Sequence, residues 1–429
     1  MRKNVFFILV AIFFIQCQTK YPGVPKSYEK LLDVAFEKAD SNALEMMNAI
    51  AQTPNDQKEG MAFLISYMPE IDLKSLSAEY LLENVEYAYK AKEKFSWCAA
   101  LPESIFLNEV LPYYNISEER EFWRKDFFDR FSKYVENTED LIDAIFIIAD
   151  TIKSETGVEY NTKRSRVDIS PLQAIEEKMA TCTGLSILLT DAYRAVGIPS
   201  RVAGTPMWTN YRGNHTWSEV LLDGEWKFIE YYPDSLNKSW FLADAGKADP
   251  DNPLHWIYAV SYKPTGEYYY ASGLSKYLYG KIDKNLLPKR LQKYYDREKD
   301  DKVKMEEPYV HGVNVTQRYI NIYEKSQEKM KLTDDELICN FVVYKNEDKH
   351  SSDSRIKSRV EVHLDDKMVN FGYSPKETDD LNQLLKIKLK KNTEYKVIVK
   401  NLLLKDDYIT TISTKDLQSQ DFIINLEIK

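Results

Sequence analysis

A succession of helix and strand signals between Ser170 and Asp234 constrains the fold more than any other part of the chain. A capped helix start at Ser170-Pro171 is followed by a second helix, whose apolar residues recur at helical spacing: Leu185, Leu188, Leu189, Ala192 and Val196. Gly197 ends that helix ahead of Pro199, and the residues that follow alternate as strands. Two helices that lead directly into a strand hairpin predict a mixed α+β domain with the second helix buried.

A cysteine stands at the first position of that buried helix. Cys182 lies between Thr181 and Thr183, directly before the apolar period begins. The unpaired N–H groups and the positive end of the helix dipole at such a position stabilise a thiolate over a thiol. Acyl transfer by cysteine needs the thiolate, so Cys182 is a candidate nucleophile. An isolated cysteine is more often a buried structural thiol, which stays the alternative until a base is placed beside it.

The strands after the second helix supply a candidate base and a candidate acid. His215 begins an alternating segment, Asp223-Gly224 has the composition of a tight hairpin turn, and the return strand ends at Glu230. The open end of this hairpin brings His215 and Glu230 together, so the carboxylate can accept from the imidazole and fix its tautomer. Asp234, further along, is the alternative acid. Glu230 is preferred because it keeps the strand register opposite His215.

These residues resemble the core of the transglutaminase-like superfamily. Cys-Thr-Gly-Leu from Cys182 leads to Tyr-Arg-Ala-Val-Gly-Ile-Pro-Ser-Arg ending at Arg201, then to His-x-Trp-x-Glu-Val from His215, and then to Trp226 ahead of Glu230. The resemblance implies a papain-like cysteine acyl-transfer core with nucleophile, base and acid in that order, here Cys182, His215 and Glu230. The family usually has Asp as the acid, so Glu230 departs by one methylene. The resemblance extends to exported proteins of Bacteroides-type bacteria, several of which add a C-terminal β-sandwich.

The rest of the chain of 429 residues divides by periodicity, as expected for a length that suits two or three domains. Residues 26–97 have helical spacing, and residues 98–285 contain the catalytic stretch. Residues 286–314 are highly charged and indicate a linker, and residues 315–429 alternate with period two. The expected fold class is α+β: a papain/transglutaminase-like core with an N-terminal helical region and a C-terminal all-β sandwich.

The first residues predict export. A positive start precedes an apolar run from Val5 to Ile15, which is too short to span a bilayer but suits a signal peptide. Cys17 follows at once, so residues 1–17 resemble a lipoprotein signal segment whose cysteine becomes the lipid-bearing first residue. A cleaved secretory signal or a short membrane anchor is the alternative. We expect an exported protein that lipidated Cys17 holds at the cell envelope, on the periplasmic or the outer-membrane surface.

The amino-acid composition of the chain limits the kinds of molecule that we expect it to bind. The net charge of −9 argues against nucleic acid, because phosphate binding needs a basic face. The histidines and the cysteines Cys98, Cys182 and Cys339 show no spacing typical of metal ligands, so neither a metal nor another cofactor is expected. The 30 Tyr and 7 Trp are either packing residues or the aromatic walls of a groove for sugar or peptide.

The expected function is acyl transfer or hydrolysis at amide bonds of peptide, glycopeptide or cell-wall substrates. Cys182 would attack an amide carbonyl as a thiolate, His215 would protonate the departing amine, and Glu230 would hold the imidazole. One oxyanion donor is expected from the Cys182 N–H, and the sequence does not place the second. Hydrolysis is favoured over cross-linking to a second amine. The alternative of another class is a catalytically silent cell-surface scaffold that binds glycan or protein partners.

Overall fold

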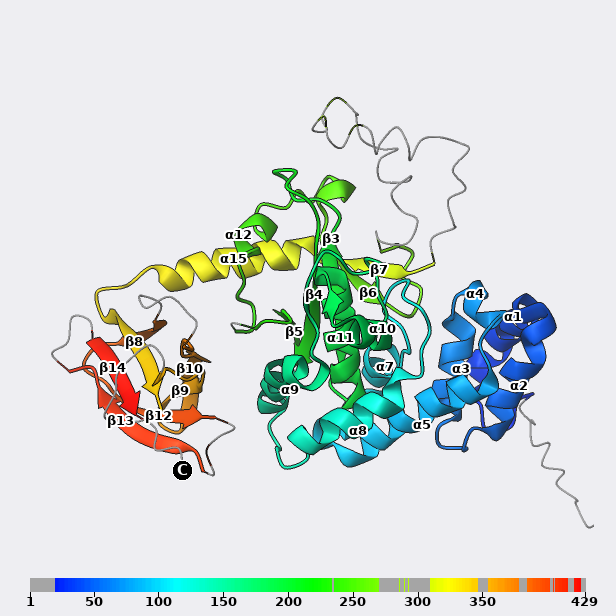
Figure 1. Ribbon diagram of the computed structural model, residues 1–429, viewed down its shortest axis with the longest axis horizontal. Helices are drawn as coiled ribbons and strands as arrows, with labels where there is room; N and C mark the ends of the chain where they lie inside the picture. Colours follow the sequence, from blue (N-terminus) through cyan, green and yellow to red (C-terminus); the bar gives the residue numbers. More distant parts are fainter. Residues whose placement is uncertain are drawn as a thin grey trace, which may run out of the picture.

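The computed structural model describes residues 20–233, 235–269, 285, 289, 292, 309–345, 354–377, 384–401, 404, 406–415 and 420–425. Three parts follow one another along the chain: a group of helices, an α+β core and a pair of β-sheets (Figure 1). The expected α+β class is confirmed. Cys17, Asp234 and most of the linker expected at 286–314 lie outside the described residues. The linker prediction is wrong for its last residues, because His311–Asn314 form a strand of the core sheet. Within the described ranges, no helix has the length and apolar character needed to cross a bilayer.

The N-terminal part is a set of short helices packed against one another. They are α1 (Glu29–Ala39), α2 (Ala43–Gln52), α3 (Lys58–Tyr67), α4 (Glu70–Leu73), α5 (Ala78–Lys94) and α6 (Ser96–Ala99). Ser77 caps α5, because its hydroxyl accepts from the N–H of Tyr80, and the helix packs against α8 of the core. The buried side chains of these helices form one continuous hydrophobic cluster with those on the α11 side of the central part. The N-terminal helices therefore pack directly against the core and share its hydrophobic interior.

The central part is an antiparallel sheet between helices. Its strands lie in the order β5 (Glu225–Ile229), β4 (His215–Leu222), β3 (Ser200–Thr205), β6 (Tyr258–Ser261) and β7 (His311–Asn314). The helices and short strands of this part are α7 (Glu103–Ile105), α8 (Trp123–Val135), α9 (Leu141–Thr156), β1 (Glu159–Tyr160), α10 (Pro171–Glu177), β2 (Met179–Ala180), α11 (Cys182–Ala195), α12 (Leu242–Ala245) and α15 (Thr316–Met330). Of these, α9, α11, α12 and α15 pack against the sheet.

Alternate residues of β4 face different helices, as the pleat of a strand requires. Thr216 and Ser218 face α11, where their hydroxyls lie 3.2 Å from that of Thr183 and 3.1 Å from that of Thr190. Trp217 lies on the opposite face, against α12 and α15. All residues of α11 after Cys182 are buried, so the helix predicted to lie inside the domain does so.

The expectation that period-two strands begin near residue 315 is wrong for residues 316–330. Residues 316–330 form the helix α15 instead. Contacts of its side chains with strand β4 hold this helix against the sheet. Nε1 of Trp217 donates to the Tyr319 hydroxyl at 2.5 Å, and that hydroxyl donates to Glu219 at 2.6 Å. Arg318 adds an ion pair with Glu219. The first strand of the last part therefore begins only at Glu336.

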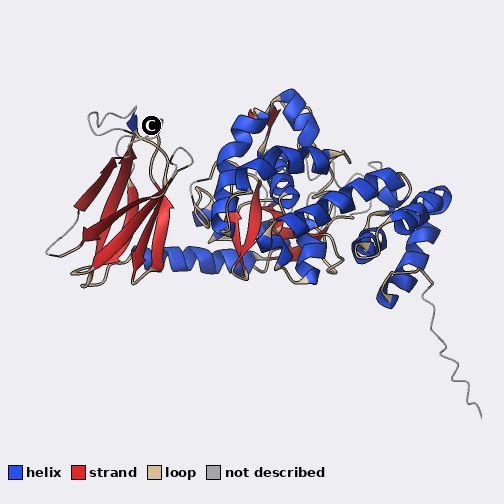
Figure 2. Cartoon of the chain, turned by 90° about the horizontal axis from the view of Figure 1, so that it is seen from below, coloured by secondary structure: helices blue, strands red, loops and turns tan. Residues whose placement is uncertain are grey.

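The C-terminal part is a sandwich of two sheets, as expected (Figure 2). One sheet consists of β10 (Lys367–Tyr373), β9 (Arg359–Leu364), β12 (Glu394–Lys400) and β13 (Tyr408–Ser413), in that order. The other consists of β11 (Leu385–Lys390), β8 (Glu336–Tyr344) and β14 (Gln420–Asn425). Alternate residues fill the space between the sheets, among them Leu337 and Cys339 of β8 and Val360 and Val362 of β9. β14 pairs with β8 in parallel, while the other described pairs of the sandwich are antiparallel.

Candidate active site

Cys182 is the first residue of α11, and short elements before it fix its position. β1 pairs in parallel with β2, which ends at Ala180, so the chain enters the helix from a held strand. Gly184 lies in the first turn, where a Cβ would come within 2.5 Å of Cγ2 of Ile169. A side chain at this position would push the helix away. Cys182 is left partly exposed, whereas Cys98 is buried.

His215 and Glu230 meet at the open end of the β4–β5 hairpin. His215 is the first residue of β4, and Nε2 of its ring lies 2.7 Å from Oε1 of Glu230. The register of the hairpin puts Glu230 beside Trp217 and one diagonal step from His215, not directly opposite it as the sequence suggested. The hydroxyl of Ser239 donates to the second carboxylate oxygen. Glu230 is thus held from one side while it holds the imidazole on the other.

Cys182 and His215 form a hydrogen-bonded pair. Because Nε2 faces Glu230, Nδ1 is the nitrogen left to face the sulfur. Burial alone would raise the pKa of the Cys182 thiol, but the bond to His215 and its charge, with donors from Thr216 and Thr183, hold that pKa below its ordinary value. Burial alone would lower the pKa of His215, but its bonds to Cys182 and Glu230 outweigh this and raise it to about 9. Both shifts favour the form of the pair in which Cys182 is a thiolate and His215 an imidazolium.

Aromatic rings surround the imidazole. The ring centroids of Trp240, Phe241 and Trp217 lie 4.9, 5.2 and 5.7 Å from that of His215. Trp217 and Phe241 are buried, and their stacked rings have centroids 4.3 Å apart, so the two rings together pack against the imidazole of His215. Trp240 is 62% exposed. Its indole is therefore a surface that a bound molecule can contact next to the base.

The family model of the transglutaminase-like superfamily matches residues 129–232, a range that includes the Cys182, His215 and Glu230 just described. These residues form a transglutaminase-like domain. A solved protein of Cytophaga hutchinsonii, named a "Putative Cysteine Protease", is 19% identical over 32% of this chain and 45% of that chain, with a TM-score of 0.26. This chain thus spans less than half the length of that protein. No curated protein matches. The transglutaminase-like domain and its Cys–His pair indicate a cysteine enzyme.

The transglutaminase-like domain uses residues that the sequence motifs did not identify as part of the site. Ser239 reaches Glu230 from the loop after β5, and Trp240 follows it directly. Arg164 reaches Thr181, the residue before Cys182, from the loop after β1. Loops of this kind have no periodic pattern, so only the folded chain brings these side chains to the site.

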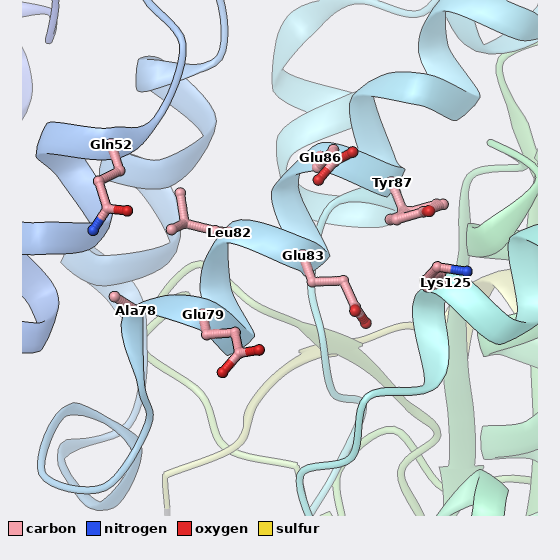
Figure 3. Close-up of a pocket in the computed structure, with 8 residues that line it drawn as sticks. All are labelled: Gln52, Ala78, Glu79, Leu82, Glu83, Glu86, Tyr87 and Lys125. Atoms are coloured by element: carbon pink, nitrogen blue, oxygen red, sulfur yellow. The ribbon is translucent and has the colours of Figure 1, made fainter.

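Two hollows of the described surface contain no cysteine or histidine. The hollow in Figure 3, of about 470 Å³, lies beside α5 and is lined by Gln52, Ala78, Glu79, Leu82, Glu83, Glu86, Tyr87 and Lys125. A second, of about 830 Å³, lies between α9 and the sandwich and includes Tyr231 and Tyr232. Neither offers a nucleophile with a base beside it, unlike the transglutaminase-like domain at Cys182.

Proposed function

We propose that this protein is a cysteine hydrolase or acyltransferase acting on amide bonds of peptide, glycopeptide or cell-wall substrates. The observation that carries the proposal is the hydrogen-bonded series from Cys182 through His215 to Glu230 inside a transglutaminase-like domain. Cys182 acts as the nucleophile, His215 as its base and Glu230 as the group that orients the imidazole. No step needs a cofactor, because the chemistry consists of proton transfer and acyl exchange.

In the first step, the sulfur of Cys182 attacks the amide carbonyl carbon. The C–S bond forms, the C–N bond breaks, and the imidazolium of His215 gives its proton to the nitrogen of the departing amine. The products are a thioester and a free amine. The N–H of Cys182, at the first position of α11, has no acceptor within its own helix and donates to the carbonyl oxygen as it becomes negative.

In the second step, the neutral imidazole takes a proton from water, and the water oxygen attacks the thioester carbon. The C–S bond breaks, a carboxylic acid leaves, and the thiolate–imidazolium pair is restored. A second amine in place of water would give a cross-linked product. Hydrolysis is favoured because Cys182 is partly exposed and Trp240 beside His215 is 62% exposed, so water reaches the thioester.

We also propose that the protein is exported and anchored by lipid at Cys17. The support is the sequence of residues 1–17, with a positive start, a short apolar run and a cysteine directly after it. This places the enzyme in the cell envelope, where cell-wall amides occur. Mass spectrometry of the mature N-terminus tests the anchor: a lipid-bearing Cys17 is expected, and an unmodified N-terminus elsewhere would contradict it.

Product analysis tests the enzymatic proposal. Incubation with peptidoglycan fragments should release new amines and carboxylates, or should attach a labelled amine when one is added; mass spectrometry identifies either product. Cys182→Ala should abolish both. Cys339→Ala is the matched control, because Cys339 is buried in the sandwich and burial raises the pKa of its thiol to about 11.

A catalytically silent scaffold is the alternative of another class. It would use the exposed Trp240 and the sandwich to bind glycan or protein partners without chemistry. A scaffold has no need of a lowered pKa at Cys182. Binding of peptidoglycan with no product from the wild type, and a Cys182 that reacts as an ordinary thiol, would favour the scaffold over the enzyme.

A further inference from the structure

The loop at residues 162–166 borders Cys182 and carries three cations. Arg166 forms ion pairs with Asp168 at 3.0 Å and with Glu119 at 3.1 Å. Arg164 differs: among the residues that the structure describes, no carboxylate forms an ion pair with it. The chain has a net charge of −9 and thus an excess of acids. A guanidinium that pairs with none of them is available to bind an acidic ligand.

Two hydrogen bonds direct Arg164 to the nucleophile. Its Nε donates to Oγ1 of Thr181 at 3.1 Å, and Thr181 directly precedes Cys182. Its Nη1 donates to the carbonyl of Thr162 at 3.0 Å. Neither bond uses Nη2. The guanidinium therefore retains N–H donors in the planar arrangement that matches a carboxylate.

The loop that carries Arg164 is fixed by its own backbone contacts. The N–H of Asn161 donates to the carbonyl of Ala180 at 2.9 Å, which ties the start of the loop to β2. The N–H of Lys163 donates to Oδ1 of Asn161 at 2.9 Å, and the N–H of Ser165 donates to Glu177 at 3.0 Å. A cation on a held loop loses less freedom on binding than one on a mobile loop, so its contact contributes more to affinity.

Formation of the thioester places the leaving amine and the acyl half of the substrate on different sides of Cys182. The departing amine must lie within hydrogen-bond reach of His215, so the leaving group points toward the sheet and Trp240. The acyl half then takes the other direction, toward Thr181 and the loop that holds Arg164. Arg164 is therefore placed to contact the part of the substrate that stays on the enzyme.

We propose that the acyl half of the substrate carries a carboxylate that binds Arg164, which makes acidic peptide or glycopeptide amides the substrate class. This rests on the proposed function, because an acyl half exists only if Cys182 forms the thioester. The carboxylate is either an acidic side chain or the α-carboxylate of a γ-linked residue. Arg164 acts here as a residue that determines specificity, separate from the groups that move protons.

Matched alkylating probes test this without knowledge of the natural substrate. Acetyl-glutamyl and acetyl-glutaminyl chloromethyl ketones place either a carboxylate or a neutral amide on the acyl side of the sulfur. A second pair, γ-linked, places the free α-carboxylate or its amide there. The wild type should react with one acidic probe about 2- to 5-fold faster than with its neutral partner, as expected for one partly exposed ion pair. The pair that shows the preference identifies the source of the carboxylate.

Three variants isolate the role of Arg164. Arg164→Gln should lose the preference, so that the acidic and the neutral probe of each pair react at the same rate. Arg164→Lys should retain part of it, because the charge remains without the planar pair of donors. Arg166→Gln removes the same charge from the same loop. This variant should keep the preference for the acidic probe, because Arg166 is already paired with Asp168 and Glu119. Thermal unfolding of each variant shows that the fold is intact.

Two results would overturn the inference. Equal rates with the acidic and neutral probes in the wild type would show that no carboxylate is recognised. An equal loss with all probes in Arg164→Gln would assign Arg164 to the oxyanion or the thiolate instead. Failure of the proposed function looks different: Cys182 would then react with neither the probes nor iodoacetamide below the pH of an ordinary thiol, and both proposals would fall.

Discussion

The carboxylate of Glu230 determines how firmly the imidazole keeps its proton. At the scale of residues, Cys182, His215 and Glu230 support one another's charges, and Ser239 holds the outer carboxylate oxygen. Motif spacing was enough to predict that Cys182, His215 and Glu230 come together, because the helix start and the hairpin are local patterns. Ser239 could not be predicted, since it reaches Glu230 from a loop whose path depends on the folded chain. Asp234, the other acid considered, lies outside the described residues.

Replacement of the Glu230 carboxylate tests this mutual support. Glu230→Gln keeps the shape and removes the negative charge, so the pKa of His215 should fall from its value of about 9. The thiolate then loses part of its cationic partner, and the pH midpoint for alkylation of Cys182 should rise by roughly one unit. Glu225→Gln on the same strand is the control, because Glu225 is exposed and paired with Lys227. A wild-type profile in Glu230→Gln would remove Glu230 from the site.

At the scale of elements, the entry into α11 positions the sulfur. The sequence predicted the helix from Cys182 to the stop at Gly197, and the structure has α11 from Cys182 to Ala195. β1 and β2 were not predicted, because strands of two residues have no measurable period. The strand prediction failed at α15, although Tyr319, Ile322 and Tyr323 recur at helical spacing and could have revealed the helix.

Gly184 offers a test of this entry. An added methyl would meet Cγ2 of Ile169 at 2.5 Å and Cβ of Ala180 at 3.0 Å. Alanine favours a helix by about 1 kcal/mol over glycine, but overpacking costs about 1–3 kcal/mol, so Gly184→Ala should lower the free energy of unfolding. It should also slow alkylation of Cys182, because the first turn must shift. Thermal unfolding and alkylation rates measure the two effects.

A second substitution provides the control for Gly184. Ile169→Ala removes the methyl group that the new side chain meets, so the double variant should recover the alkylation rate even though Ile169→Ala alone costs stability. If Gly184→Ala proved as stable and as reactive as the wild type, the close approach of α11 to the preceding segment would not position the sulfur.

At the scale of the whole molecule, α9 of the core is the support for the sandwich. Asp143 of α9 accepts from Arg359 and from Lys400, the latter at 2.9 Å. The ring of Phe146 lies 4.5 Å from that of Tyr373. The alternation of the last strands predicted a sandwich, but nothing in the sequence predicted where it docks, because these contacts join residues far apart in the chain. In Figure 1, α15 provides the covalent connection between the two parts.

Asp143 tests how the sandwich is held. Asp143→Asn removes the anion by which α9 binds Arg359 and Lys400, and leaves these cations paired only with Glu361 inside the sandwich, so docking should weaken by roughly 1–3 kcal/mol. Limited proteolysis between the core and the sandwich should become faster, while the alkylation rate of Cys182 stays unchanged. Asp129→Asn is the control, since Asp129 forms an exposed pair with Lys125 within α8. Equal cleavage of the Asp143 and Asp129 variants would mean that this contact does not hold the sandwich.

The pH dependence of Cys182 alkylation by iodoacetamide is the most direct measurement of the central claim, that His215 keeps this sulfur anionic. The rate is followed at Cys182 by mass spectrometry in the wild type and in His215→Ala. We expect a wild-type midpoint below about 8.5, the pKa of an ordinary thiol, and a return toward that value in His215→Ala. A wild-type midpoint at or above the ordinary value, unchanged by His215→Ala, would contradict the claim.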